Sequence, residues 1–166
     1  MPEFADLSVL VVDPNPNMRQ IVRSMLRSAG IHHVVQAQDG KEALKMHRHR
    51  AFDAMITEWD MPGLHGKRLI WTVRRDSSKD RHRIPILVLA ADSSRKTVTA
   101  ARDAGAHAFM QKPVSSRNLS RRIDDIVNRP RGFVETKSYV GPDRRFFASS
   151  AYSGEDRRNE QADAAS

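Results

Sequence analysis

The stretch Val9-Leu10-Val11-Val12-Asp13 decides the fold, because it is a short apolar run, rich in β-branched residues, that ends at a carboxylate. A strand that is buried on both faces of a parallel sheet reads as such a continuous apolar run rather than as an alternation of apolar and polar residues. The run therefore predicts a buried parallel strand over residues 9–12, with Asp13 just beyond its carboxyl end.

Segments of strand and helix character alternate along residues 1–128. After the first strand, Asn17 is expected to cap a helix that ends at Gly30, where glycine tolerates a positive φ. The apolar residues at helical spacing in this helix are Met18, Ile21, Val22, Met25 and Leu26. The later predicted strands are 34–37, 52–57, 86–89 and 108–111, and the later predicted helices surround Ala43, surround Leu69, and span 95–104 and 117–128. The five alternations indicate an α/β fold with a doubly wound parallel sheet, covered by helices on both faces.

The composition limits the classes of function. The net charge of +8 and the pI of about 10.4 make anionic partners worth testing. Residues 129–166 carry seven Lys or Arg and six Asp or Glu, a net of +1, which leaves +7 on residues 1–128. The absence of cysteine excludes disulfides and thiolate metal sites. No apolar run is long enough to cross a membrane and no signal peptide is recognisable, so we expect a cytoplasmic protein.

Folds of this class place their chemistry beyond the carboxyl ends of the strands. The residues at these ends are Asp13, Glu58, Ala90 and Lys112. The motifs around them are Val11-Val12-Asp13, Glu58-Trp59-Asp60-Met61-Pro62-Gly63, Asp103-Ala104-Gly105-Ala106 and Lys112-Pro113. At these spacings the motifs resemble the CheY-like receiver domain of two-component response regulators, over about residues 7–128.

This resemblance implies a flavodoxin-like receiver fold, with five parallel strands in the order 2-1-3-4-5, over residues 1–128. It also implies a cis peptide bond between Lys112 and Pro113. The segment Arg129-Pro130-Arg131-Gly132 breaks the last helix and marks a boundary. Beyond it we expect a C-terminal extension made of an arginine-rich ligand-binding tail over 129–160 and a disordered end over 161–166.

The phosphorylation site that the family carries is incomplete in this sequence. The family has two acids after the first strand, a nucleophilic aspartate after the third, Ser or Thr after the fourth, and a lysine after the fifth. This chain keeps Asp13 and Lys112, but it has Pro14, Glu58 and Ala90 at the other three positions. Pro14 removes a ligand from a Mg²⁺ site that needs near-ideal geometry, Glu58 is longer than in-line attack tolerates, and Ala90 cannot bond a phosphoryl oxygen. We therefore expect neither phosphorylation nor catalytic residues, and no bound metal, Mg²⁺ included.

Two interpretations of Glu58 stay open at this point. Its carboxylate, reaching toward Lys112, either imitates a phosphoaspartate or forms an ion pair that remained after the chemistry was lost. Phe109 matches the aromatic switch of the family and, lacking a hydroxyl, is expected to stay packed. The face that the family uses for output would carry Arg95, Lys96, Arg102, Phe109, Arg117, Arg121 and Arg122. The charges of this face, and those of the loop over 74–83, also fit an ordinary solvated surface.

A seven-residue pattern, Tyr-x-Gly-x-Asp-Arg-Arg, occurs twice in the tail, at 139–145 and at 152–158. Arginine matches phosphate and the O6 and N7 atoms of guanine, and its plane can stack on a base, as tyrosine does. Aspartate can accept hydrogen bonds from the N1 and N2 edge of guanine, and glycine permits close backbone approach. Each copy is therefore a candidate site for one guanine nucleotide, and two copies suit cyclic di-GMP.

The predicted ligand-binding residues are Arg131, Tyr139, Gly141, Pro142, Asp143, Arg144, Arg145, Tyr152, Gly154, Asp156, Arg157 and Arg158. An arginine-rich tail on a receiver resembles the Cle family, the CheY-like cyclic di-GMP effectors. This resemblance implies a protein that is not an enzyme, that binds cyclic di-GMP, and that docks on the flagellar motor switch to modulate motility and surface attachment.

Three alternatives stay open. The chain could be a phosphorelay receiver that uses Asp13 or Asp60, or a nucleic-acid-binding protein that uses its basic surface and tail. The six carboxylates of the tail argue against nucleic acid. The tail could also be a solvated, disordered extension.

Overall fold

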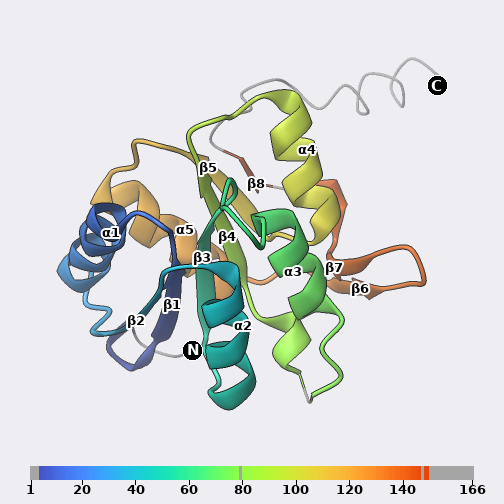
Figure 1. The fold of residues 1–166 in the computed structure, drawn as a ribbon, viewed down its shortest axis with the longest axis horizontal. Helices are drawn as coiled ribbons and strands as arrows, with labels where there is room; N and C mark the ends of the chain where they lie inside the picture. Colours follow the sequence, from blue (N-terminus) through green and yellow to red (C-terminus); the bar gives the residue numbers. More distant parts are fainter. Residues whose placement is uncertain (1–3, 79, 147, 150–166) are drawn as a thin grey trace.

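The computed structural model describes residues 4–78, 80–146 and 148–149, which form a parallel sheet between two layers of helices (Figure 1). Strands β1 (Ser8–Val12), β2 (His33–Ala37), β3 (Ala54–Glu58), β4 (Ile86–Ala90) and β5 (Ala108–Gln111) lie in the order β2-β1-β3-β4-β5, and all neighbouring pairs are parallel. The predicted fold class and strand order are confirmed. A further short strand, β8 (Ala148–Ser149), extends the sheet beyond the five by pairing with β5.

The helices cover both faces of the sheet. Helices α1 (Pro16–Ser28) and α5 (Ser116–Asn128) lie on one face, and α2 (Gly40–His49), α3 (Gly66–Arg74) and α4 (Arg95–Ala104) lie on the other (Figure 1). Short 3-10 helices are η1 (Phe4–Asp6), η2 (Arg81–Arg83) and η3 (Arg144–Phe146).

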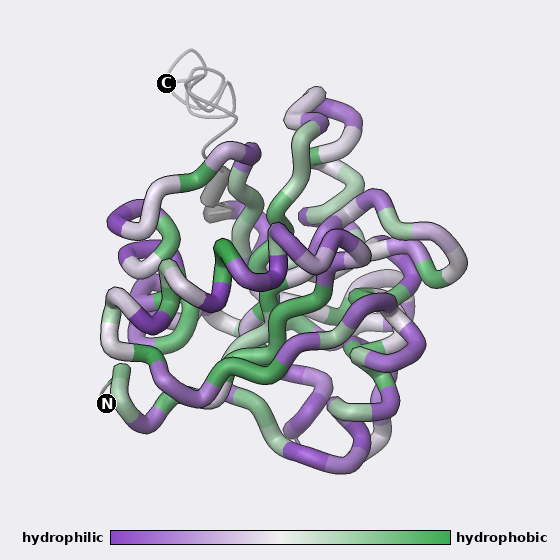
Figure 2. The backbone as a smooth tube through the Cα atoms, turned by 60° about the vertical axis from the view of Figure 1, so that its left-hand side comes forward, coloured by the Kyte–Doolittle hydropathy of each residue, from purple (hydrophilic) through white to green (hydrophobic). Residues whose placement is uncertain are grey.

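Each face of the sheet has its own apolar core, because successive side chains of a strand point to opposite faces. Along β1, Leu10 and Val12 belong to the core beneath α2, α3 and α4, whereas Val9 and Val11 belong to the core beneath α1 and α5. Figure 2 shows the hydrophobic strands passing through the middle of the fold, inside a more hydrophilic outer layer. The first strand is therefore buried on both faces, as its sequence predicts.

Three local predictions are corrected by the structure. The side chain of Asn15 accepts hydrogen bonds from the backbone N–H groups of Asn17 and Met18, so Asn15 rather than Asn17 caps α1. The helix starts earlier because Pro16 is suited to the first helical position, where a missing N–H costs nothing.

Ile21 follows the apolar spacing of α1 but is 46% exposed, since Val22 and Leu26 already fill the buried stripe of the helix. The third strand lies at Ala54–Glu58 instead of 52–57. The expected cis peptide bond at Lys112–Pro113 is confirmed.

The extension after α5 forms an antiparallel hairpin of β6 (Phe133–Glu135) and β7 (Val140–Pro142), beside the turn between α4 and β5. Gly105 ends α4 with a positive φ of 114°, and a Cβ atom there would lie 2.7 Å from the carbonyl oxygen of Val140. The guanidinium of Arg131 donates hydrogen bonds to the carbonyl oxygens of Asp143 (2.8 Å) and His107. The described part of the extension is therefore attached to the sheet domain through backbone contacts and buried side chains.

Candidate functional site

The carboxyl ends of four strands bring Asp13, Glu58, Ala90 and Lys112 together, as the sequence predicts for a parallel sheet. The ammonium Nζ of Lys112 lies 3.0 Å from Oδ2 of Asp13 and also forms an ion pair with Oε2 of Glu58. The three charged side chains are largely buried, with exposed fractions of 17% for Lys112, 10% for Asp13 and 11% for Glu58. Ala90 is fully buried, and its carbonyl oxygen accepts a hydrogen bond from the N–H of Lys112 at 2.9 Å.

The other oxygen of each carboxylate accepts hydrogen bonds from backbone N–H groups. Oδ1 of Asp13 accepts a hydrogen bond from the N–H of Asn15 at 2.8 Å. Oε1 of Glu58 accepts from the N–H groups of Trp59 at 2.8 Å and Asp60 at 3.2 Å. All the carboxylate oxygens of this site therefore already have a donor from the protein itself. Phe109 lies in β5 with no exposed surface.

Lys112 is held as a cation by this site. Burial lowers the pKa of its ammonium, but the hydrogen bonds and charges of Glu58 and Asp13 outweigh burial and raise that pKa above the ordinary 10.5. A lysine whose pKa is raised by folding stabilises the fold below its unfolded pKa, and this contribution is lost as the pH rises through the folded pKa.

Replacing Lys112 by methionine is expected to lower the free energy of unfolding by about 2 kcal/mol at neutral pH, because two neighbouring carboxylates lose their shared cation. Urea unfolding followed by circular dichroism measures the difference from the unsubstituted chain. The difference should stay constant up to about pH 10 and shrink above the ordinary lysine pKa of 10.5.

The matched control for this experiment is Lys45→Met, which removes an exposed lysine of α2 and should change little. A Lys112→Met chain as stable as the control would show that the ion pairs contribute nothing.

The first copy of the repeated pattern divides into buried and exposed residues. Tyr139 is 6% exposed, and its hydroxyl donates to the carbonyl oxygen of Pro142 at 2.7 Å. Gly141 and Pro142 are buried in the same hairpin. The guanidinium of Arg144 lies 4.3 Å from the centre of the Tyr139 ring and 3.1 Å from a carboxylate oxygen of Asp103 at the end of α4. The buried ring of Tyr139 therefore packs beneath the guanidinium of Arg144 and fixes its position.

Next to Tyr139, the partly buried Asp143 forms an ion pair with the exposed Arg145. Nε of Arg145 lies 3.1 Å and 2.9 Å from the two carboxylate oxygens of Asp143, and the Arg145 side chain is 75% exposed. Hydrogen bonds from the side chain and the N–H of Arg145 lower the pKa of Asp143 to about 2. Arg131, by contrast, is partly buried and binds carbonyl oxygens. The predicted residues of the second copy, Tyr152, Gly154, Asp156, Arg157 and Arg158, lie outside the described residues.

A buried cluster around Arg74 was not found by sequence reasoning, which assigned Arg74 to a solvated basic loop. The structure contradicts that assignment, because Arg74 lies in α3 and is 1% exposed. Its Nη2 lies 3.1 Å from Nδ1 of His107, which is also buried. Burial, helped by the charges of Arg74 and Arg131, holds the pKa of His107 well below its ordinary value. The sequence does contain a signal for the burial of Arg74, which is its helical spacing. Arg74 follows Ile70 by one turn and therefore lies on the apolar side of α3.

The predicted output face is partly exposed. Arg95, Lys96, Arg117 and Arg121 are exposed, Arg102 and Arg122 are half-buried, and Phe109 is buried.

Within the described ranges, no helix is long and apolar enough to cross a membrane. The same ranges contain no group of three or more His, Asp or Glu side chains that could hold a metal ion.

A 2-1-3-4-5 parallel sheet, with carboxylates and a lysine at its carboxyl edge, defines a flavodoxin-like receiver domain. The family model of the response regulator receiver domain matches residues 9–124, and the chain belongs to this family.

Curated relatives and solved structures agree with this assignment. Chemotaxis protein CheY-3 of Vibrio cholerae is 32% identical over 124 residues, which cover 75% of this chain and 94% of the relative. Chemotaxis protein CheY of Pseudomonas aeruginosa is 33% identical over 126 residues, which cover 76% of this chain and all of the relative. The structure of Vibrio cholerae CheY4 superposes with a TM-score of 0.67 at 30% identity, covering 72% of this chain and 98% of that one. A putative response regulator from Chloroflexus aurantiacus gives a TM-score of 0.69 at 30% identity, covering 74% and 98%.

Proposed function

We propose that this receiver domain acts as a binding protein rather than as an enzyme or a phosphate acceptor. Its input would be cyclic di-GMP, bound by the C-terminal extension, and its output would be docking on another protein. The flagellar motor switch is the proposed docking partner, in line with the chemotaxis names of the relatives. The observation that carries the proposal is the pair of exposed guanidinium groups in the hairpin: Arg144 lies over the ring of the buried Tyr139, and Arg145 pairs with Asp143 beside it.

The charged site at the edge of the sheet supports a domain that works without phosphorylation. Mg²⁺ takes oxygen ligands in near-ideal octahedral geometry. Here the oxygens of Asp13 and Glu58 are bound by an ammonium and by backbone N–H groups, so this donor set does not fit Mg²⁺. Ala90 offers no hydroxyl for a phosphoryl group. The ammonium of Lys112 already neutralises Glu58, which supports the interpretation of the site as a permanent ion pair.

The geometry of the extension supports a ligand that carries phosphate and guanine. Arg144 and Arg145 present planar donor groups to solvent, which match phosphate oxygens and the O6 and N7 atoms of guanine. Asp143, with its lowered pKa, remains an acceptor at neutral pH. Tyr139 would act beneath Arg144 rather than against a base, because it is buried. The proposed ligand would therefore contact the two arginines first.

Isothermal titration calorimetry with cyclic di-GMP tests the proposal on the full chain. We expect a dissociation constant of about 1 μM or lower, and binding at least about 100-fold weaker in the Arg144→Ala/Arg145→Ala variant, because each charge-assisted contact contributes about 1.5–3 kcal/mol. The matched control is Arg117→Ala/Arg121→Ala, which removes two exposed arginines of α5.

Two outcomes would contradict the proposal. Either the unsubstituted chain gives no heat with cyclic di-GMP, or the Arg144→Ala/Arg145→Ala variant binds as tightly as the control. Titrations with GTP and with single-stranded RNA separate the dinucleotide from phosphate binding in general. Incubation with a small phosphodonor and Mg²⁺ tests the phosphorelay alternative, and we expect no labelled protein.

A further inference from the structure

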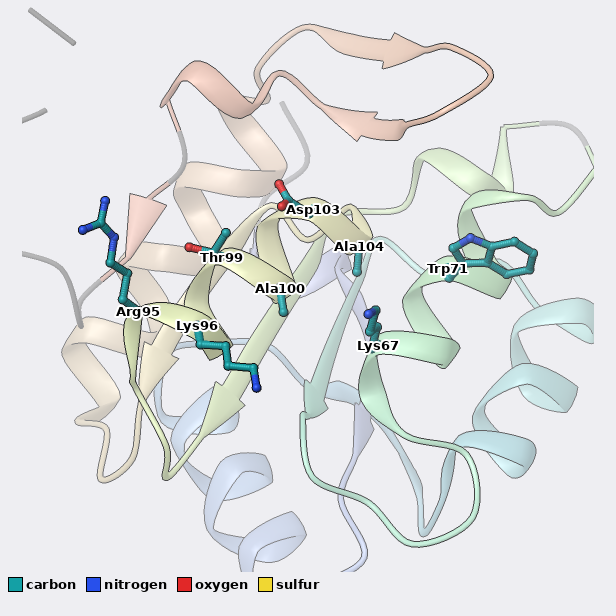
Figure 3. A pocket seen from close by; sticks show the side chains of 8 residues that line it. All are labelled: Lys67, Trp71, Arg95, Lys96, Thr99, Ala100, Asp103 and Ala104. Carbon is teal, nitrogen blue, oxygen red and sulfur yellow. The ribbon is translucent and has the colours of Figure 1, made fainter. Parts of the chain in front are cut away.

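A groove of about 580 Å³ lies between α3 and α4, away from the charged site at the edge of the sheet (Figure 3). Trp71 and Lys67 of α3 form one side, and Lys96, Ala100, Asp103 and Ala104 of α4 form the other. Figure 3 shows the two lysines on opposite sides of the groove, with the two alanines along the α4 side. The groove therefore combines an apolar floor with a cation on each side.

Trp71 is unusually exposed for a large aromatic residue. Its exposed fraction is 42%, and Ile21 is the only other large hydrophobic residue of the described chain that is exposed to this degree. The guanidinium groups of Arg75 and Arg68 lie 4.0 Å and 5.0 Å from the centre of its ring. An aromatic side chain that stays half in water beside arginines is typical of a binding surface, where Trp and Arg are enriched.

The charge of the groove selects an anionic partner. Lys67 and Lys96 lie in it, and Arg68 and Arg75 lie at the Trp71 end. The acid among its lining residues, Asp103, is neutralised by Arg102 at 3.2 Å and by Arg144 at 3.1 Å. A partner with negative charges would therefore meet an almost uncompensated positive surface.

We propose that the groove between α3 and α4 docks a segment of another protein in which an apolar side chain is flanked by Asp or Glu. The apolar side chain lies on Ala100 and Ala104 between the two helices, and the carboxylates pair with Lys67 and Lys96. Trp71, whose ring Figure 3 shows turned away from α4, borders the groove on the α3 side. Nucleic acid fits less well, because two guanidinium groups already lie over the Trp71 ring, where a base would have to stack. This proposal does not depend on cyclic di-GMP binding by the extension.

Selection of short random peptides displayed on phage, with the full chain immobilised, tests the proposal. We expect enrichment of peptides that contain an aromatic or aliphatic residue flanked by acids. By fluorescence anisotropy, an enriched peptide should bind the Lys67→Glu/Lys96→Glu variant at least about tenfold more weakly than the unsubstituted chain. Because Trp59 is buried, a change in tryptophan fluorescence on binding should report Trp71 and should disappear in Trp71→Ala.

The matched control is Lys41→Glu/Lys45→Glu, which reverses the same number of charges on exposed lysines of α2. This control should retain binding. The proposal is overturned if no acidic peptides are enriched, if the groove variant and the control bind equally, or if single-stranded DNA competes for the groove more strongly than the peptide does. Circular dichroism of each variant establishes that the chain is folded.

Discussion

Replacing Arg74 by leucine is expected to lower the free energy of unfolding by about 3 kcal/mol, a large effect for a single residue far from the charged site. The guanidinium donates hydrogen bonds to the carbonyl oxygens of His82 at 2.6 Å, Ile84 at 2.8 Å and Gly105 at 2.9 Å. Leucine fills part of the space but leaves these buried acceptors without a donor, at a cost of about 1–3 kcal/mol each. Relief from burying a charge offsets part of that cost.

Arg74 stabilises more than its own helix. It joins the end of α3 to the η2 segment and to the turn between α4 and β5, and it lies 5.4 Å from the centre of the Phe133 ring in the hairpin. Burial, only partly offset by Tyr139, lowers the pKa of the guanidinium to about 9, so the group is still charged at neutral pH. Replacing Arg74 by leucine should therefore also weaken the attachment of the hairpin to the sheet domain.

Chemical denaturation of Arg74→Leu and of a matched control, Arg121→Leu on the exposed side of α5, measures this effect. Arg74→Lys should not restore stability, because a single ammonium cannot reach acceptors that are spread around a planar guanidinium. Equal unfolding midpoints for Arg74→Leu and Arg121→Leu would contradict the prediction.

Replacing Gly141 by alanine is expected to detach the hairpin from the sheet domain while leaving the domain folded. A Cβ atom at Gly141 would lie 2.5 Å from the hydroxyl oxygen of Tyr139 and 2.9 Å from Cα of Gly105. The tyrosine hydroxyl is held by its hydrogen bond to Pro142, and Gly105 is part of the backbone that ends α4. Neither neighbour can move without breaking a contact, so the hairpin has to shift.

Hydrogen exchange of backbone amides detects this detachment. The N–H of Asp143 donates to the carbonyl oxygen of Gly132 at 2.7 Å, and its protection should fall by at least about tenfold in Gly141→Ala. The amides of β1 and β3 should keep their protection.

Gly132→Ala is the control, because a Cβ atom at Gly132 would meet nothing within 4 Å. Unchanged protection of Asp143 in Gly141→Ala would show that the hairpin tolerates the methyl group. If the hairpin positions Arg144 and Arg145, the same variant should also weaken cyclic di-GMP binding.

Much of the fold and of the charged site could be predicted from the sequence. The buried strands appear as continuous apolar runs, and the residues at their carboxyl ends have to meet because the strands are parallel. Asp13, Glu58 and Lys112 are brought together for this reason, although Asp13 and Lys112 are far apart in the chain. The start of α1 was misplaced because Asn15 and Asn17 are both good caps, and the geometry of Pro16 decides between them.

The role of the extension could not be predicted in the same way. Its first repeat reads as polar because its arginines and aspartate dominate the composition. Tyr139 is nevertheless buried, because the hairpin places it against the turn that Gly105 makes. The close contacts join Gly105, in the turn after α4, to Val140 and Gly141 of β7, and no local pattern contains them.

The sequence by itself determined the alternation of strands and helices, the motifs by which it resembles receiver domains, and the set of charged residues at the edge of the sheet, because periodicity and motif spacing are local properties of the chain. The strand order followed from that resemblance, and the structure confirmed it. Only the tertiary structure showed that Lys112 forms ion pairs with both Asp13 and Glu58, and that Trp71 borders a basic groove. It also showed that Arg74 is buried and joins several segments through hydrogen bonds. Burial and hydrogen bonding depend on which segments the fold brings side by side. An arginine or a tryptophan therefore acquires its role from neighbours that are distant in sequence.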